Sequence, residues 1–296
     1  MTATIPTIVG FMPTPFASTG QVDSERLSAL AGDIAAAGIR PAVLGGMGEY
    51  YALDHDESRQ CMEAAVAGAG GVPVVAGIGW ATREAVAIAS DAARLGIHTA
   101  VINPPHYASP SPRAYAEHVR RVTDAAGTGA IVYSAAHFPM TDAYLDRLVQ
   151  VDGFRGVKEE HYDVATTADR ARRWGDRVEW WGVGEVSGSA YAAAGAGTVT
   201  TSLANLRPDL AVRAITALTG GGEDPDAVAA AVEWTELLAA DPDGAPAFLT
   251  EVMHQSRGWN RTVRLPLLPS GADVQKTVAD FIGQWADAAI GSEATR

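Results

Sequence analysis

The fold is constrained most by a regular alternation of short β-rich runs with longer alanine-rich runs of helical periodicity. Eight strand-like runs occur, over residues 8–12, 42–45, 73–77, 99–103, 130–133, 154–158, 178–183 and 197–201. The helical runs between them begin at Asp23 or Ser24 and recur near 56–69, 82–95, 112–126, 141–150, 164–174, 187–195 and 207–219. These eight βα units predict an α/β fold of the (β/α)8 TIM-barrel type. A doubly wound open sheet is the alternative, but the even spacing of the units favours a closed barrel.

The alternation stops at a run of glycines, Gly220-Gly221-Gly222. Three further helical runs follow, near 224–240, 243–256 and 271–290, with no strand-like run among them. We therefore predict a barrel over residues 1–222 and a C-terminal helical extension over residues 223–296 that packs on it. A chain of 296 residues is a normal length for one barrel with such an appendage.

Composition excludes several classes of partner. The net charge of −13 repels phosphate backbones and anionic lipid, so we expect no nucleic-acid partner. No apolar run reaches the roughly 18 residues needed to cross a bilayer, and we expect no membrane partner. Residues 1–10 carry no signal-peptide pattern, and the single Cys61 excludes an internal disulfide. Both observations favour a cytoplasmic protein.

The most informative residue is Lys158, at the end of the sixth strand-like run. Lys158 and Lys276 are the only lysines among 22 cationic residues, so lysine is chosen at this position by a chain that otherwise uses arginine. Arginine cannot form an imine, whereas a lysine in an apolar pocket can be neutral near pH 7 and attack a carbonyl. A solvated lysine at a strand edge is the alternative; we favour a catalytic amine.

Tyr133 ends the fifth strand-like run, one βα unit before Lys158. The active site of a closed barrel lies at the carboxyl ends of its strands, so we expect the two side chains to face each other at the barrel mouth. A phenol beside an amine can relay protons to a carbinolamine and to a leaving group. Alone, Tyr133 could be a packing residue; next to Lys158 we favour a catalytic role.

A glycine-rich turn, Gly45-Gly46-Met47-Gly48-Glu49, follows the second strand-like run. Glycines in such a turn let backbone N–H groups approach an anion such as a carboxylate. A tight strand-to-helix turn is the structural alternative. No Gly-Lys-Ser/Thr sequence follows, which excludes a nucleotide phosphate loop.

No motif for a cofactor or a metal stands out, and we expect neither. Gly182-Val183-Gly184 with Gly188 imitates a dinucleotide fingerprint, but its third glycine is one position late. The acidic segment 159–163 matches no metal-ligand spacing, and we interpret it as a solvated loop. Loops at the barrel mouth also carry His106 and His137, each of which could contact substrate or be a simple loop residue.

Taken together, these residues resemble the dihydrodipicolinate synthase / N-acetylneuraminate lyase family over essentially the whole chain. The matching landmarks, in chain order, are Thr14-Pro15-Phe16, Gly45–Glu49, Ala76-Gly77, Pro104–Tyr107, Tyr133, Gly156–Glu159, Ala204-Asn205 with Pro208, and Val263–Leu267. The resemblance implies a Schiff-base lyase acting on a 2-oxo acid such as pyruvate, without a cofactor. It also implies a homo-oligomer, either a dimer or a tetramer built as a dimer of dimers.

The resemblance also implies roles for single residues. Lys158 would form the imine, Tyr133 would shuttle protons, and the turn at Gly46 and Met47 would hold the substrate carboxylate. Tyr107 could reach into the site of a neighbouring subunit. The remaining expected substrate contacts are His137, Phe138, Glu185 and Ser202.

Three departures from the family pattern bear on the substrate. Gly46 and Met47 stand where the family has two hydroxyl residues, so the proton relay of the tyrosine lacks its hydroxyl. Ser134 replaces the asparagine that often follows the tyrosine, and Phe138 replaces an arginine of dihydrodipicolinate synthases. We therefore expect an aldolase or dehydratase that is not the lysine-pathway synthase. A 5-dehydro-4-deoxyglucarate dehydratase-like enzyme, a metal-dependent lyase and an inactive barrel that senses a 2-oxo or sugar acid are the alternatives.

Overall fold

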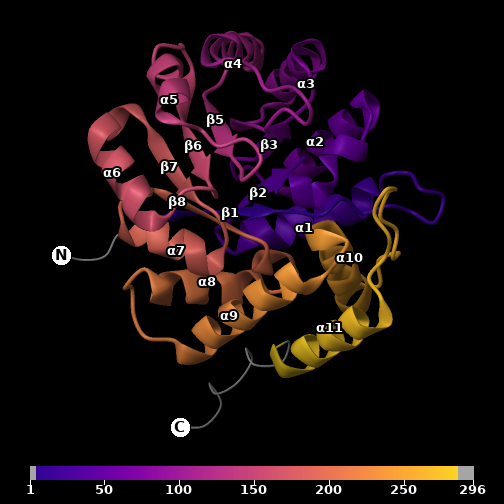
Figure 1. Cartoon of the computed structure of the whole chain (residues 1–296). Helices are drawn as coiled ribbons and strands as arrows, with labels where there is room; N and C mark the ends of the chain where they lie inside the picture. Colours follow the sequence, from indigo (N-terminus) through magenta and orange to yellow (C-terminus); the bar gives the residue numbers. More distant parts are fainter. Residues whose placement is uncertain (1–4, 286–296) are drawn as a thin grey trace.

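A computed structural model describes residues 5–285 of the chain and shows a closed barrel of parallel strands (Figure 1). The strands are β1 (Thr7–Phe11), β2 (Arg40–Val43), β3 (Val75–Ile78), β4 (Thr99–Ile102), β5 (Ala130–Ser134), β6 (Phe154–Glu159), β7 (Glu179–Gly182) and β8 (Thr198–Thr201). Each strand pairs in parallel with the next, and β8 pairs with β1 from Thr7↔Thr198 to Gly10↔Thr201. The predicted (β/α)8 barrel is confirmed, and the open-sheet alternative is wrong.

A ring of helices surrounds the strands, and three more helices follow the barrel. The helices are α1 (Ser24–Ala36), α2 (His55–Gly68), α3 (Thr82–Leu95), α4 (Pro112–Ala126), α5 (Asp142–Leu148), α6 (Val164–Trp174), α7 (Glu185–Ala193), α8 (Pro208–Leu218), α9 (Pro225–Ala240), α10 (Gly244–Arg257) and α11 (Ala272–Trp285). Each predicted helical run overlaps one of them. The predicted end of the last run, residues 286–290, lies outside the described residues.

Local sequence signals fix several helix ends. The Asp23 side chain accepts from the N–H of Arg26 and begins α1, which settles the choice between Asp23 and Ser24. Asp54 and Glu57 form a reciprocal capping box at the start of α2. Gly96 ends α3 in the left-handed conformation, with φ of 77°, which glycine adopts without a steric cost.

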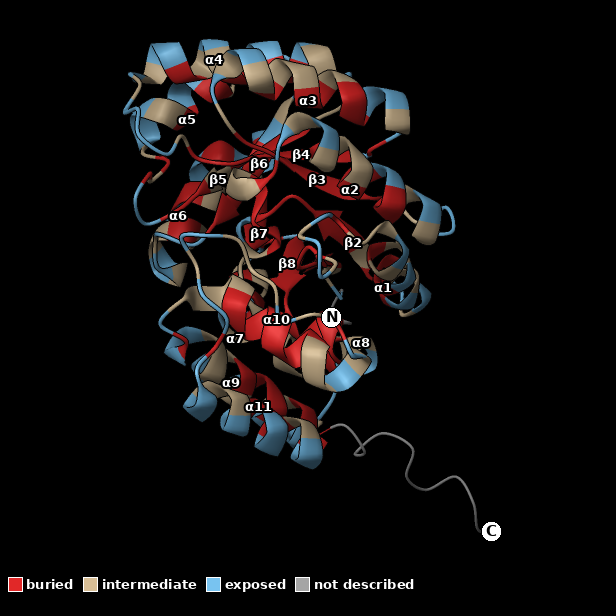
Figure 2. Ribbon diagram, turned by 90° about the vertical axis from the view of Figure 1, so that its right-hand side faces the viewer, coloured by how far each residue is buried: buried red, intermediate tan, exposed pale blue. Residues whose placement is uncertain are grey.

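The core has two layers separated by the wall of the barrel. Side chains of successive strand residues point to opposite faces, so one set fills the barrel and the other packs against helices. The set inside the barrel is Val9, Phe11, Ala42, Val75, Val101, Ile131 and Trp181. Figure 2 shows the strands mostly buried and the helices buried mainly on the sides that face them. Side chains therefore fill the interior of the barrel.

Trp234 of α9 joins the C-terminal helices to the barrel. Its ring is fully buried and packs at 5.1 Å from Phe248 of α10 and at 5.4 Å from Phe281 of α11, measured between ring centroids. Its Nε1–H donates to Ser202 Oγ at 2.8 Å, in the loop after β8. No strand follows β8 up to residue 285. The division at residue 222 stays a prediction, and in Figure 1 these helices lie together along one side of the barrel.

Across residues 5–285, the helices are too short or too polar for any of them to cross a membrane.

Candidate active site

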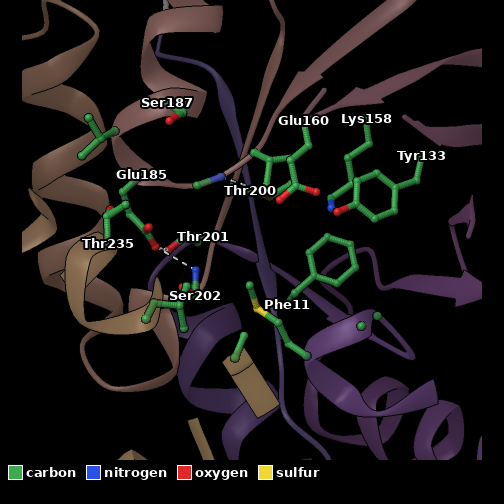
Figure 3. A pocket seen from close by; sticks show the side chains of 18 of the residues that line it. Phe11, Tyr133, Lys158, Glu160, Glu185, Ser187, Thr200, Thr201, Ser202 and Thr235 are labelled. Atoms are coloured by element: carbon green, nitrogen blue, oxygen red, sulfur yellow. Dashed lines mark hydrogen bonds between the residues drawn. The ribbon is translucent and has the colours of Figure 1, made fainter. Parts of the chain in front are cut away.

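A cavity of about 450 Å³ opens at the carboxyl ends of the strands, where the active sites of such barrels lie. Its walls come from the ends of β1 and of β4 to β8, from the turn after β2, and from α7, α9 and α10. The polar side chains in the walls are Asn103, Tyr133, Lys158, Glu160, Glu185, Ser187, Tyr191, Thr200, Thr201, Ser202 and Thr235. Figure 3 shows Tyr133, Lys158 and Glu160 projecting into the same part of this space.

Lys158 stands in the cavity wall between Tyr133 and Trp181, its neighbours in the register of β5 and β7. Its Nζ lies 3.6 Å from the centroid of the Tyr133 ring and 5.2 Å from that of Phe11. The residue is only 8% exposed, and it forms no ion pair with any described carboxylate. Burial without a counter-charge lowers the pKa of Lys158 to about 7.

That environment suits a nucleophilic amine. A sizeable fraction of the side chain is neutral at neutral pH, whereas an exposed lysine is almost entirely charged. The faces of two aromatic rings also stabilise the charged form through cation–π contact, so the amine can gain and lose its proton in place. Because Tyr133 and Lys158 are paired across adjacent strands, their backbones fix the phenol beside the amine.

The turn after β2 forms the wall next to Phe11. Residues Gly46–Gly48 make one turn of 3-10 helix, and Gly46 and Met47 line the cavity. A Cβ at Gly45 would lie 2.6 Å from the Phe11 ring, so only glycine lets the turn pass this close to the barrel interior. The first N–H groups of a helical turn have no partner within it, which leaves donors available for an anion.

Glu185 and Ser202 also line the cavity: Glu185 begins α7, and Ser202 directly follows β8. Glu185 is buried, and its Oε1 accepts hydrogen bonds from Thr201 Oγ1 at 2.7 Å and from the N–H groups of Ser202 and Leu203 at 2.8 Å. Ser202 Oγ accepts from Trp234. The two residues therefore hold the loop after β8 in place as well as lining the cavity.

Glu160, His161 and Asp163 are exposed, as expected of a solvated loop over residues 159–163, but Glu159 is an exception. It is fully buried on the outer face of β6, where its Oε1 accepts from the N–H groups of His161 and Tyr162 at 2.8 and 3.0 Å. Its Oε2 lies 3.6 Å from a guanidinium nitrogen of Arg170 in α6. Strand alternation continues to Glu159, so its side chain faces α6, where a buried acid needs a partner.

Arg170 is the centre of that buried network. Its side chain is 6% exposed, donates to Asp142 at 3.0 Å and to the carbonyl of Met140, and lies 4.3 Å from the Tyr162 ring centroid. No group of three or more metal-binding side chains occurs anywhere in residues 5–285.

Three predicted substrate contacts lie outside the cavity. Tyr107 and His137 are exposed on their loops. Phe138 is buried, 5.1 Å from the Tyr115 ring and 5.4 Å from the Tyr144 ring, because the turn from Ala135 folds it back against α4 and α5. The structure therefore brings together Lys158, Tyr133, Gly46, Met47, Glu185 and Ser202, but not these three.

The most informative lining residue that sequence reasoning missed is Glu160. Strand alternation indicates this position, because residues two apart on a strand point to the same face and Glu160 follows Lys158 by two. The contributions of Thr235, Leu238, Ala239 and Ala245 could not be foreseen, since α9 and α10 are distant in sequence from the strand ends.

Lys158 is the only cationic side chain among the described residues that line the cavity. Arg207, which follows β8, donates to Asp209 and to the carbonyl of Trp285 and is not part of the cavity wall. The cavity therefore offers one titratable amine and two carboxyl groups, Glu160 and Glu185.

The sequence matches a known protein family and several named relatives. The model of the dihydrodipicolinate synthetase family matches residues 4–285. A protein of Chelativorans sp. (strain BNC1), named a probable 5-dehydro-4-deoxyglucarate dehydratase, is 33% identical over 182 residues, which are 60% of each chain. An Azotobacter vinelandii protein of the same name is 29% identical over 211 residues, 69% of this chain and 70% of that one. The chain thus matches only three fifths of the length of the first relative.

Solved structures share the whole fold. The dihydrodipicolinate synthase of Bacillus clausii is 25% identical, with a TM-score of 0.85 over 95% of this chain and 98% of that one. The sialic acid aldolase of Ruminococcus gnavus is 17% identical with the same TM-score of 0.85, over 95% of this chain and 97% of that one. The second likeness concerns the fold alone.

Proposed function

Because the chain belongs to the dihydrodipicolinate synthetase family, we propose that it is a Schiff-base lyase in which Lys158 forms an imine with a 2-oxo acid. The observation that carries this proposal is a buried lysine without a counter-charge, placed beside a tyrosine at the mouth of the barrel. A structural lysine would be paired or solvated, whereas a nucleophile needs a neutral fraction.

The reaction would begin with attack of neutral Lys158 Nζ on the C2 carbonyl carbon. The carbinolamine that forms loses its hydroxyl as water once a proton reaches that oxygen, and a cationic imine remains. The phenol of Tyr133 lies against the amine and is the nearest group that can supply this proton. The cationic imine then accepts the electron pair of a bond broken at C3, which is the step common to aldol cleavage and dehydration.

The substrate carboxylate would lie at the turn of Gly46 and Met47. This part of the lining offers backbone N–H donors, while the two carboxyl groups of the lining, Glu160 and Glu185, stand on other elements. The rest of the substrate would then extend toward Glu160, Ser187 and Thr235. We therefore infer a 2-oxo acid whose tail is larger or less charged than that of a dicarboxylate.

Both aldolase and dehydratase chemistry fit this site. A 5-dehydro-4-deoxyglucarate dehydratase-like activity is the second candidate, favoured by the names of the relatives with 33% and 29% identity. The absence of any second cation from the described cavity wall weighs against a dicarboxylate such as that substrate. Turnover of any 2-oxo acid would exclude the alternative of an inactive sensor.

We further infer that the protein is cytoplasmic and forms a homo-oligomer. In that assembly the exposed Tyr107 would reach the site of a neighbouring copy.

The proposal is tested by borohydride trapping. The protein is incubated with pyruvate, 2-oxobutanoate or phenylpyruvate, reduced with borohydride, and examined by mass spectrometry. We expect at least one acid to add its mass to the peptide that contains Lys158. The initial trapping rate should rise with pH and be half-maximal near pH 7, because the amine attacks only after losing the proton whose pKa burial lowers to about 7.

Two results would contradict the proposal. One is the absence of an adduct with all three acids; the other is an adduct on Lys276, which lies exposed on α11 and serves as an internal control. A trapping rate that still climbs steeply above pH 9 would instead show that Lys158 keeps an ordinary pKa.

We also expect no useful dihydrodipicolinate synthase activity with pyruvate and aspartate semialdehyde. The second substrate brings a carboxylate, and no described arginine lines the cavity to bind it. A missing charge-assisted pair lowers affinity by about 1.5–3 kcal/mol, more than tenfold. A coupled assay measures this directly, and a specificity constant at or above about 10⁴ M⁻¹s⁻¹ would disprove the expectation.

A further inference from the structure

Glu160 is a carboxyl group in the cavity that no described residue engages. It follows β6 directly, and its backbone N–H donates to the carbonyl of Ser134 at 3.1 Å, which ties it to the end of β5. Its side chain lines the cavity and forms no hydrogen bond or ion pair within residues 5–285. The residue is exposed to solvent, and partial desolvation by the surrounding atoms raises the pKa of this carboxyl above its ordinary value.

Contacts of the neighbouring residues fix the backbone position of Glu160. The adjacent Glu159 accepts hydrogen bonds from the N–H groups of His161 and Tyr162, so the backbone on both sides of Glu160 is held. Arg170 packs against Tyr162 and approaches Glu159 from α6. A carboxyl group that lines the cavity on a backbone fixed in this way, without a partner among residues 5–285, is available to act on a bound substrate.

The other acid and the phenol in the cavity are less suited to move a proton at the substrate tail. Glu185 accepts three hydrogen bonds through Oε1 and holds the loop after β8. Tyr133 lies with its ring against Lys158, beside the C2 and nitrogen end of an imine. Its hydroxyl has no described hydrogen-bond partner to pass a proton on, since Gly46 and Met47 carry no hydroxyl.

We propose that Glu160 is the acid–base residue that transfers the proton at C3 of the Lys158-bound 2-oxo acid, an inference that rests on the imine proposed above. In Figure 3 the carboxylate of Glu160 and the amine of Lys158 point toward the same part of the cavity. Glu160 and Lys158 line the same cavity, so a 2-oxo acid held as an imine on Lys158 lies in the space that Glu160 also lines.

The step balances without any other reactant. The carboxylate of Glu160 takes a proton from C3, the C–H electron pair forms a C2=C3 double bond, and the C=N π pair moves to nitrogen to give a neutral enamine. In the reverse direction the carboxylic acid returns the proton to C3. Dehydration uses the first direction and aldol cleavage ends with the second, so the assignment holds for both.

The test is exchange of the C3 protons of pyruvate in D₂O, followed by proton NMR, alongside borohydride trapping of the same samples. Glu160→Gln keeps the shape of the side chain and removes its acid–base function. We expect its exchange rate to fall about 100-fold or more while its trapped fraction stays as in the wild type. Glu160→Asp should retain an intermediate rate. Glu25→Gln, the same change at an exposed position in the first turn of α1, should exchange like the wild type.

Each other outcome is decisive. If the wild type is trapped and Glu160→Gln exchanges within about threefold of it, the assignment is wrong; loss of exchange in Tyr133→Phe alone would then identify the phenol as the base. If Glu160→Gln folds but is not trapped, Glu160 acts in imine formation and the assignment is again wrong. If wild-type protein is trapped by neither pyruvate, 2-oxobutanoate nor phenylpyruvate, the proposed function itself fails.

Discussion

Replacing Lys158 with arginine should abolish both borohydride trapping and turnover. The guanidinium keeps the positive charge and the long stem but cannot lose its proton or form an imine, so the covalent route is lost. Loss of a nucleophile typically lowers kcat by on the order of 10⁴–10⁶, which brings it close to background. The measurement is the mass spectrum after reduction, together with turnover of whichever 2-oxo acid labels the wild type.

Lys276→Arg is the matched control for this variant. It makes the same substitution at the only other lysine, which is exposed and close to Asp280 on α11. We expect wild-type trapping and wild-type turnover from it. Retention of turnover by Lys158→Arg, with thermal unfolding unchanged in both variants, would show that the reaction does not pass through an imine on Lys158.

The second large effect is expected on stability, from Arg170→Met. The substitution keeps much of the apolar stem of Arg170 but removes its contacts with Glu159, Asp142 and the Met140 carbonyl. Glu159 is fully buried and would be left without its cationic partner. Breaking a buried pair from one side costs about 3–5 kcal/mol, and we expect a loss of that size in the free energy of unfolding by urea.

Two further variants test whether the loss of stability in Arg170→Met comes from the buried network. Arg172→Met makes the same change two residues along α6, where the side chain is 72% exposed, and should alter stability by no more than about 0.5 kcal/mol. Adding Glu159→Gln to Arg170→Met should restore part of the loss, because the uncompensated charge is removed. Equal effects of Arg170→Met and Arg172→Met would show that the buried network contributes little.

The fold could be predicted from the sequence because its determinants are local. Strand and helix periods, caps such as Asp54 with Glu57, and stops such as Gly96 each act within a few residues. Parallel strands joined by helices in even units leave few topologies other than a closed barrel. The position of Tyr133 beside Lys158 followed from the same regularity, since both end adjacent strands.

The rest of the site depends on contacts that neighbouring sequence does not encode. Phe138 was expected at the mouth because it replaces a family arginine, yet a short turn places it between Tyr115 and Tyr144. Glu159 and Glu160 were treated alike, although strand alternation sends the first to α6 and the second into the cavity. Closer use of that alternation would have separated them.

The cavity wall formed by α9 and α10 has a consequence for how the ligands of this barrel can change. The amine and the phenol stand on barrel strands, while Thr235, Leu238, Ala239 and Ala245 come from helices added after the barrel. Substitutions in those helices can reshape the space for the substrate tail and leave the reacting groups where they are. Substitutions in α9 and α10 can therefore change which substrates fit the cavity, provided that Trp234 still attaches these helices to the loop after β8.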